Sequence, residues 1–372
     1  MQEIAVEILA DSISPQGHRV TSMLLTFPRF ILAEAKTHRI ISGFHGEVEV
    51  LEDVSINSFR EGSKNSASSR AIPFEKMVKM VEEDPFIPIA WQKDHKGMQG
   101  TEYYTNKDSI KQLTRLWLEG RDAAVEIAKA LNGPHVLDYD NPDGKAGVTK
   151  QLCNRLLEPF MWHTVLVTAT EWENFFNLRC PKYYFEPSDA YFRSRKDFVE
   201  EYNATFKVGI DILTEMKVDD LTIEEWHNKF NHSQAEIHIQ ALAEKMWDAM
   251  NESVPRVLSP GMWHYPFYKA MPFGVTWEDA IKIATARCAR LSYSTFDKEI
   301  NYKKDLELHD RLLRDRHMSP FEHCLKAMSS QEYYRFRKGW MNAKENEDIT
   351  TRGWCDNFQG WISYRYLIEH EV

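Results

Sequence analysis

The chain has 372 residues, of which 46 are basic and 56 are acidic, so its formal net charge is −10. This negative balance argues against a nucleic-acid polymer as partner, because proteins that bind nucleic acids usually carry a surplus of Lys and Arg. With 43% apolar and 27% charged residues the composition is typical of a folded protein, and it excludes wholesale disorder.

The first part of the chain carries strand patterns followed by helix patterns. Alternating apolar and polar residues over 4–8 and an apolar, partly branched run over 20–27 predict two early strands. The spacing of apolar residues then predicts a short helix over 29–39. A second helix is predicted over 74–83, where a proline follows the last turn.

Most of the remaining signals are helical. The clearest helix follows residues 105–108, which have the spacing of a capping box, and ends at Gly133. We predict further helices over 150–157, 161–177, 234–250, 277–289, 304–314 and 331–341. The periodicity alone thus predicts an α/β protein in which helices dominate. A dense mixture of acidic and basic residues over 181–232 predicts a surface insertion.

The five cysteines lie far apart and never form a CxxC pair, so they are interpreted as reduced packing residues rather than a disulfide framework or a zinc site. The N-terminus carries acidic residues where a signal peptide carries basic ones. No stretch approaches about eighteen uncharged apolar residues. We therefore expect a cytoplasmic protein with no membrane partner.

Any phosphate must be held by side chains, because glycine is scarce and neither GxGxxG nor GxxxxGK[ST] occurs. A first candidate group combines His38 and Arg39 with the polar run 63–70. The hydroxyls, amide and guanidinium of this run offer many donors to an anion. The alternative is a polar loop that caps the helix starting at Phe74.

A second candidate group consists of Arg155 and Arg179, which lie in strongly apolar segments. Burying an arginine is costly unless the guanidinium meets a carboxylate or a phosphate. Ion pairs inside the chain, with Glu158, Glu171 or Glu173, are the alternative to a ligand.

Two further groups contain histidines. Residues 234–238 begin an amphipathic helix, and His238 taken alone fits a surface or core role better than a catalytic one. His317, Glu322 and His323 follow one another closely, but their spacing is not one that zinc sites use, so we expect no metal. No serine lies in a GxSxG elbow, which leaves a hydrolase triad without support.

Together these groups resemble the flavin-dependent thymidylate synthases, whose signature is Arg-His-Arg followed by Ser-x-Asn-Glu-x-Ser-x-Arg. The residues that match this signature are His38, Arg39, Ser63, Asn65, Ser68 and Arg70. The other motifs of that family match at 155–159, 174–179, 234–237, 289–293 and 317–323. Six short motifs that agree are far more specific than any one of them.

The resemblance spans nearly the whole chain, but the order of the motifs differs. In most members of that family the segments matching 289–293 and 317–323 precede the Arg-His-Arg motif, so this chain looks circularly permuted. Such a rearrangement is tolerable where the original termini lie close together on the surface. The long, permuted form resembles phage members of the family, and we expect one domain over 1–372.

The signature also departs from the family pattern. Thr37 replaces the first Arg, Ser66 replaces the Glu, and Ala71 replaces the Tyr that follows the last Arg. The segments 43–62 and 181–232 are interpreted as insertions. Losing one Arg weakens the expected grip on the flavin diphosphate.

The resemblance implies a methyltransferase that makes dTMP from dUMP without a cysteine nucleophile. NADPH would reduce bound FAD, methylenetetrahydrofolate would supply the one-carbon unit, and the flavin would supply the hydride. These small molecules would be its partners. The implied fold is α/β of the α+β type, with a mixed, antiparallel-rich sheet and many helices, assembled as a homotetramer.

Site residues are carried over from the family motif by motif. Arg179 takes the catalytic role, because a cation beside the uracil stabilises negative charge that develops on its oxygens. The dUMP-binding residues would be Ser68, Arg70, Arg155 and Arg179. The FAD-binding residues would be His38, Arg39, Asn174, His317, Glu322 and His323. Weaker candidates are Gln234 and Ser292.

Two alternatives stay open. A dUMP hydroxymethylase, in which water in place of hydride meets the exocyclic methylene intermediate, is the closest one, and a dCMP-directed enzyme is a variant of it. A non-catalytic flavin- or nucleotide-binding relative belongs to another class. The replacements Thr37 and Ser66 favour the non-catalytic relative, whereas retention of four motif arginines argues against it.

Overall fold

Many helices surround several small sheets in this protein. The computed structural model describes residues 2–36, 73–96, 100–133, 147–206, 221–291, 301–336 and 352–370. The fold is mixed α/β, and 53% of the described residues are helical and 18% are in strands, which confirms that helices dominate there. The predicted insertion over 43–62 lies outside the described ranges, as do the predicted site residues His38, Arg39, Ser68 and Arg70 and the weaker candidate Ser292.

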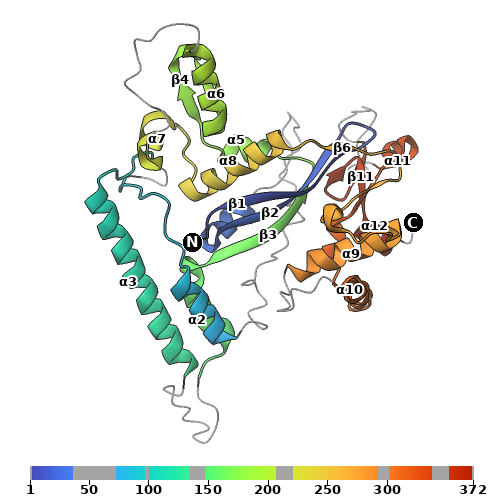
Figure 1. Ribbon diagram of the computed structural model, residues 1–372, viewed down its shortest axis with the longest axis horizontal. Coiled ribbons are helices and arrows are strands. Elements are labelled where there is room, and N and C mark those ends of the chain that lie inside the picture. Colours follow the sequence, from blue (N-terminus) through green and yellow to red (C-terminus); the bar gives the residue numbers. More distant parts are fainter. Residues whose placement is uncertain are drawn as a thin grey trace, which may run out of the picture.

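A four-stranded sheet lies at the centre of the molecule (Figure 1). It consists of β1 (Ala5–Ile13), β2 (Arg19–Pro28), β3 (Trp162–Ala169) and β6 (Arg256–Val257), in the order β3-β2-β1-β6. β1, β2 and β3 pair antiparallel, whereas β6 pairs parallel to β1. The expectation of a mixed, antiparallel-rich sheet is therefore confirmed at the level of architecture.

Three smaller sheets complete the strands of the described ranges. One contains β7 (Trp263–His264), β8 (Leu325–Ala327) and β11 (Trp361–Ser363), in the order β11-β8-β7. The other two are the pairs β9 (Trp354–Cys355) with β10 (Phe358–Gln359), and β4 (Tyr183–Phe185) with β5 (Ala190–Phe192).

The described α-helices are α1 (Leu32–Lys36), α2 (Phe74–Glu83), α3 (Lys107–Asn132), α4 (Lys150–Cys153), α5 (Glu173–Arg179), α6 (Arg195–Phe206), α7 (Ile223–Phe230), α8 (Ile237–Glu252), α9 (Trp277–Arg290), α10 (Tyr302–Arg314), α11 (Ser330–Arg335) and α12 (Tyr364–Glu369). The described 3-10 helices are η1 (Arg29–Ile31), η2 (Asn154–Phe160), η3 (Glu186–Ser188), η5 (Tyr268–Ala270) and η6 (Ser319–His323).

Helices with an amphipathic pattern were predicted well. The helix over 74–83 is α2, and Gly133 is the C-cap of α3 as expected. The predicted capping box is wrong, because Asn106 caps α3 in place of Thr105. The Asn106 side chain lies one residue nearer the first turn, where its oxygen accepts hydrogen bonds from two backbone N–H groups.

The helix predicted over 161–177 is wrong in its first half, which forms β3. Branched residues such as Val165 and Val167 pair with β2 along the whole strand. Because β3 is buried on both faces, its sequence lacks the alternation that reveals a strand. The helix α5 follows it and ends at Arg179. At the other end of the chain, α11 stops at Arg335, within the predicted range 331–341.

The two faces of the central sheet pack against different parts of the chain. Residues with odd numbers on β2 and β3, such as Met23 and Val167, form a core with α1, α5 and α8. Residues with even numbers, such as Leu24 and Leu166, pack against Cys288 of α9. Figure 1 shows α8 on one side of β1–β3 and α9 on the other. The sheet therefore separates two layers.

A β-bulge in β1 changes which face its residues occupy. The register with β2 shifts between Ile8 and Ala10, so Leu9 is an extra residue without a partner of its own. Side chains alternate along a strand, and the extra residue reverses this alternation. Asp11 consequently points toward α8, and Ser12 points to the opposite face.

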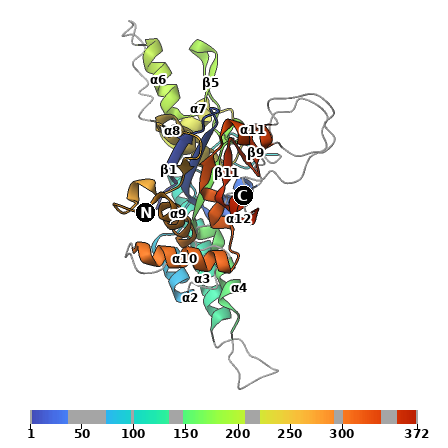
Figure 2. The ribbon, with the colours of Figure 1, turned by 90° about the vertical axis from the view of Figure 1, so that its right-hand side faces the viewer.

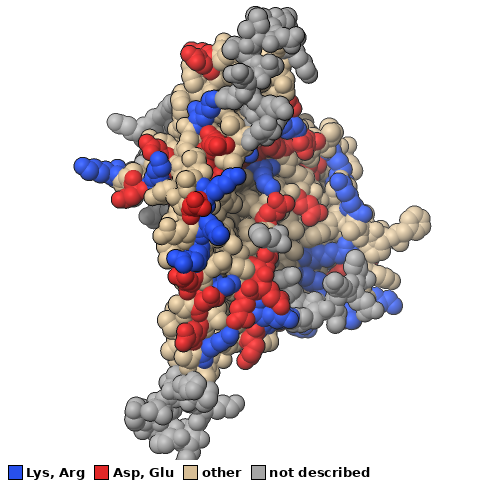
Figure 3. All heavy atoms as spheres, turned by 60° about the vertical axis from the view of Figure 1, so that its left-hand side comes forward, with Lys and Arg blue, Asp and Glu red and all other residues tan. Residues whose placement is uncertain are grey.

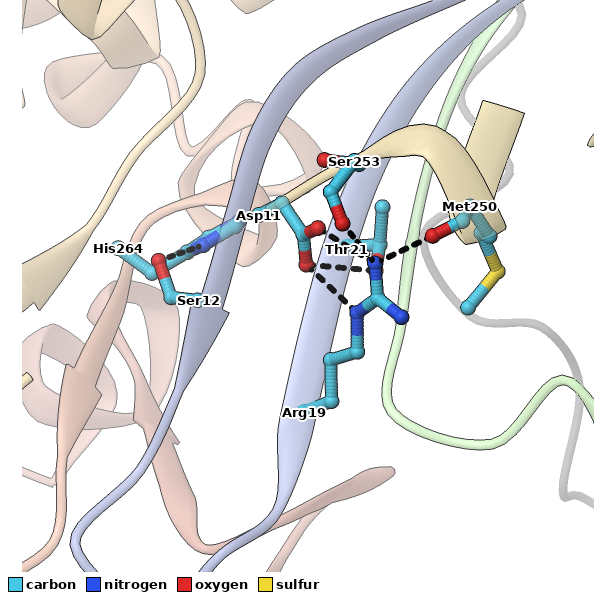
Figure 4. A network of polar contacts seen from close by, with 7 residues as sticks. All are labelled: Asp11, Ser12, Arg19, Thr21, Met250, Ser253 and His264. Carbon is cyan, nitrogen blue, oxygen red and sulfur yellow. Dashed lines mark hydrogen bonds and ion pairs between the residues drawn. The ribbon is translucent and has the colours of Figure 1, made fainter. Parts of the chain in front are cut away.

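Asp11 anchors the end of α8 to the sheet (Figure 4). The Arg19 guanidinium donates to both carboxylate oxygens of Asp11, at 2.9 and 2.6 Å, and to the carbonyl of Met250 at 2.7 Å. The Thr21 hydroxyl donates to Asp11 at 3.3 Å. This buried carboxylate of β1 is thus satisfied by two side chains of β2, and the arginine that binds it also closes the last turn of α8.

Residues 181–206 and 221–232, here called the hairpin unit, contain β4, β5, α6 and α7. Tyr183, Phe185, Phe198 and Trp226 form a small core of their own. Figure 2 shows the unit at one end of the molecule, while α2, α3 and α4 lie at the other end. The hairpin unit thus projects from the central sheet, and the interpretation of 181–232 as an insertion stays a prediction.

Replacing Arg19 should destabilise the protein strongly. In Arg19→Ala the Asp11 carboxylate stays buried without its cation, so we expect a loss of about 2–4 kcal/mol in the free energy of unfolding. Urea denaturation measures this loss. The matched control is Arg115→Ala on α3, where an exposed pair with Glu119 is worth less than about 1 kcal/mol. Equal losses in both variants would contradict the anchoring role of Asp11.

Candidate functional site

The end of α5 meets the start of α8 and the helix α1. Glu34 of α1 lies within electrostatic range of Arg179, the last residue of α5, and of Glu236, the N-cap residue of α8. Burial first, and then the charge of Glu236, raise the pKa of the Glu34 carboxyl, while Arg179 opposes this rise. We call these three residues the Arg179 cluster. It joins α1 to two segments that lie more than a hundred residues later in the sequence.

Glu236 holds the first turn of α8 and the His238 ring. Its carboxylate accepts hydrogen bonds from the backbone N–H groups of His238 and Ile239, at 2.8 and 3.2 Å. It also contacts Nδ1 of His238. Nε2 of that ring accepts from the N–H of Ile89 at 3.0 Å, so Nδ1 carries the proton. His238 is buried against Phe30 and Phe86, which confirms its interpretation as a core residue.

Arg155 lies on η2, where it shares one carboxylate with another arginine. Glu158 Oε1 lies 3.4 Å from Arg155 and 3.5 Å from Arg29. Arg29 also contacts Nδ1 of His163 at 3.1 Å. The predicted alternative, an ion pair with Glu158, is therefore present. The Arg155 side chain is nonetheless 65% exposed, and two cations on one carboxylate leave positive charge for an anion.

The side-chain amide of Asn154, the residue before Arg155, is buried with its hydrogen-bonding capacity unsatisfied. Neither its oxygen nor its nitrogen has a hydrogen-bond partner within the described ranges. A buried amide with both atoms unpaired is costly. Its donor and acceptor beside a cation fit a polar, anionic ligand such as a nucleotide.

The predicted FAD residues of the C-terminal third lie on η6 and just before it. His317 is exposed. The Glu322 carboxylate contacts Arg365. Burial raises the pKa of Glu322, and the smaller effect of Arg365 lowers it. His323 is buried, and its Nδ1 lies 2.9 Å from the hydroxyl of Thr168 on β3. Glu322 and His323 thus already contact other side chains of the protein, whereas His317 is exposed.

A chain of buried hydroxyls and imidazoles continues from Thr168 through the sheet. The Thr168 hydroxyl lies 2.6 Å from that of Ser22, which lies 2.9 Å from Nε2 of His264. Nδ1 of His264 lies 2.9 Å from the Ser12 hydroxyl (Figure 4). Burial lowers the pKa of His264 to about 3, so its ring is neutral and carries one proton. We call this the hydroxyl–imidazole chain.

No motif in the sequence predicts the hydroxyl–imidazole chain. Ser12, Ser22 and Thr168 are hydroxyl residues on three different strands, and His264 stands alone among aromatic residues. Glu34 was missed for the same reason. What brings them together is strand pairing, which no local pattern contains. The usable signal was the presence of hydroxyls on strands otherwise built for burial.

The predicted site residues fall into two groups on opposite faces of the sheet. Arg179 and the half-buried Asn174 belong to α5, which packs on the α8 side. His323 reaches Thr168 from the other side, where Leu166 meets α9. A single copy of the described chain thus does not bring Arg179 and the η6 residues face to face.

Another buried polar group joins α8 to the hairpin unit. The Glu244 carboxyl accepts from the backbone N–H of Arg195 at 2.6 Å and from the Tyr183 hydroxyl at 3.3 Å. Burial raises the pKa of Glu244 to about 7, and nearby Asp248 adds to this rise. The carboxyl therefore changes its charge near neutral pH.

The cysteines offer no nucleophile. All five are buried and none forms a disulfide, which confirms them as packing residues. Burial raises the pKa of Cys324 to about 12, and it also raises the pKa of Cys153, Cys180 and Cys355. These four thiols stay protonated at neutral pH.

Charge is unevenly spread over the surface. Figure 3 shows acidic and basic side chains interspersed on one face, with acidic groups gathered in its lower centre. Within the described ranges no three His, Cys, Asp or Glu side chains gather closely enough to hold a metal ion. In the same ranges, every helix is too short or too polar to cross a membrane.

Cutting the hydroxyl–imidazole chain should cost stability. Ser22→Ala leaves the Thr168 hydroxyl and Nε2 of His264 buried without their shared partner, so we expect a loss of about 1–3 kcal/mol in urea denaturation. The control is Thr26→Ala, which breaks a half-buried hydroxyl pair with Thr164 on the same two strands. A control loss as large as that of Ser22→Ala would contradict the importance of the chain.

Glu244 should make stability depend on pH. Its folded-state pKa, about 7, lies above the ordinary value of 4.5, so the stability that it contributes is present below about pH 4.5 and is lost as pH rises through about 7. Relative to Glu244→Gln, we expect the wild-type free energy of unfolding to fall by about 2–3 kcal/mol between about pH 5 and pH 8.

The control for this pH effect is Glu252→Gln on the same helix, where the carboxylate is exposed and pairs with Lys196. The difference in the free energy of unfolding between Glu252→Gln and wild type should stay nearly constant over the same pH range. A flat difference for Glu244→Gln as well would show that this carboxyl is ionised throughout.

Comparisons with known proteins complete the description of the site. A search against models of protein families found no match, and searches of curated proteins and of solved structures found none either.

Proposed function

We propose that this protein is a flavin-dependent thymidylate synthase, which converts dUMP to dTMP with methylenetetrahydrofolate as carbon donor and NADPH as reductant. The observation that carries the proposal is the Arg179 cluster. The motif segments that end in Arg179 and contain Glu236 meet there, beside the helix that leads toward His38 and Arg39. A chance match of short motifs has no reason to bring two of them near the same carboxyl, Glu34.

Arg179 would act on the pyrimidine of dUMP. Attack on the one-carbon unit requires carbon 5 of the uracil to become nucleophilic, which places negative charge on the ring oxygens. A half-buried guanidinium stabilises this charge more strongly than water does, because the surroundings are of lower polarity. The Glu34 carboxyl lies within electrostatic range of Arg179, so its negative charge would favour the charged guanidinium there.

The phosphate end of dUMP would lie at η2. Arg155 supplies an exposed guanidinium, and Asn154 supplies an unsatisfied donor and acceptor beside it. Ser68 and Arg70 are the further residues that the resemblance assigns to this end. Side chains would thus replace the glycine-rich loops that the sequence lacks.

Only some of the residues assigned to FAD have side chains that could contact the cofactor. His317 is exposed and Asn174 is half-buried, so both can donate hydrogen bonds to it. Glu322 and His323 are engaged with Arg365 and Thr168, so they would orient η6 rather than grip the cofactor. His38 and Arg39 would supply the charge for the diphosphate. Bound FAD would supply the hydride chemistry, and the protein would orient it and exclude water.

A complete site would need more than one copy of the chain. Arg179 and the η6 residues lie on opposite faces of the central sheet, and the sheet is filled with side chains between them. A second copy can present its η6 to the Arg179 cluster of the first. This arrangement supports the proposal of a homotetramer with shared active sites.

Arg179→Ala tests this function. We expect the purified wild type to show flavin absorption bands that shift when dUMP is added, and to release dTMP. In Arg179→Ala we expect turnover to fall by about 100- to 1,000-fold, since a donor to developing charge is lost, while the flavin bands remain. Arg179→Lys should recover part of this loss, because it restores the charge without the forked geometry.

The control is Arg115→Ala, an exposed α3 residue, which should turn over as wild type does. A product heavier than dTMP by one oxygen would identify the hydroxymethylase instead. A wild type that neither carries nor binds FAD would rule out the proposal, and binding of FAD without turnover of any pyrimidine nucleotide would favour the non-catalytic relative.

A further inference from the structure

A cavity of about 490 Å³ lies between α5 and the hairpin unit. Ligand pockets commonly measure about 300–1,000 Å³, so it is large enough for a small organic molecule. Its lining residues are Phe176, Asn177, Pro181, Lys182, Tyr191, Phe192, Arg193 and His232. None of them belongs to the Arg179 cluster or to the hydroxyl–imidazole chain.

The lining carries positive charge. Lys182 and Arg193 are its two charged residues, and no carboxylate is among the residues that form it. The Lys182 ammonium has no ion-pair partner among the described residues, and the side chain is exposed. The cavity therefore favours an anionic group, although the protein as a whole is negatively charged.

Arg193 is held in place before any ligand arrives. It donates two hydrogen bonds to the Glu173 carboxylate, at 3.1 and 2.6 Å, and contacts the Asn177 amide. Its guanidinium also lies 4.6 Å from the centre of the Trp247 ring. Glu173 offsets its charge, so Lys182 provides the main attraction for an anion and Arg193 provides fixed N–H groups. A fixed group loses little freedom on binding.

The other wall of the cavity is aromatic. The Tyr191 hydroxyl lies 3.2 Å from Nδ1 of His232, and the two rings meet edge to face. His232 in turn stacks on Tyr184, at 5.5 Å between ring centres. Tyr191 is 58% exposed although it is a large aromatic residue. Rings held open to solvent in this way are ready to stack on a planar ligand.

We infer that this cavity is a binding site for a small aromatic anion, a planar ring that bears a phosphate or a carboxylate group. The ring would stack on Tyr191 and His232, and the anionic group would meet Lys182. A nucleotide and an aminobenzoyl-glutamate both have this chemistry. The site belongs to the hairpin unit and does not depend on the proposed thymidylate synthase activity.

Isothermal titration calorimetry tests the site with four probes. AMP and p-aminobenzoyl-glutamate carry the anionic group, and adenosine and 4-aminobenzamide lack it. In Lys182→Ala we expect the dissociation constant of the anionic probe that binds to rise about tenfold, because one charge-assisted contact is lost, while its uncharged analogue is unaffected. Tyr191→Ala should weaken the anionic probe and its analogue alike, because both stack through the ring.

The control is Lys196→Ala, an exposed cation of the same unit that does not line the cavity, and it should bind as wild type does. Which anionic probe binds more tightly tells the two sources apart. The inference is overturned if no probe binds wild type, or if Lys182→Ala and Tyr191→Ala both bind as wild type does. Flavin spectra with dUMP, recorded on the same variants, should be unchanged, so failure of the cavity and failure of the proposed function give different results.

Discussion

The antiparallel pairing of β2 with β3 determines where almost every other element lies. It runs without interruption from Thr21 opposite Ala169 to Pro28 opposite Trp162. Because side chains alternate along both strands, one register assigns the odd positions to α5 and α8 and the even positions to α9 and η6. A slip of one residue would exchange the two faces. It would bury hydroxyls under α8 and turn apolar side chains toward the histidines.

The bulge in β1 extends this constraint to the polar groups. Without the extra residue Leu9, the alternation that places Ile8 toward α8 would carry Ser12 to the same face. Ser12 would then lose His264, and Asp11 would lose the arginine that ties β2 to α8. One irregular residue thus allows an ion pair on one face and a neutral hydrogen-bond chain on the other. Bulges are common where a strand must change the direction of a side chain.

The sequence predicted what local patterns encode and missed what strand pairing creates. The helix α2 follows from apolar spacing on one face, because its other face is in water. β3 has no such contrast, since both of its faces are buried, and a helix was the natural interpretation of its apolar run. The motif residue Arg179 was found because a family pattern surrounds it. Glu34, its charged neighbour, stands in no pattern, and only folding brings the two together.

The short helix α5 links the two sites that the structure suggests. It has seven residues and no side-chain cap at its N-terminus, so tertiary contacts must supply its stability. Phe175 and Phe176 pack one face of α5 into the core that it shares with α8. The Glu173 carboxylate accepts a hydrogen bond from Arg193 of the hairpin unit. Its last residue is Arg179. The ion pair between Arg193 and Glu173 therefore ties the hairpin unit to the helix that carries the proposed catalytic guanidinium.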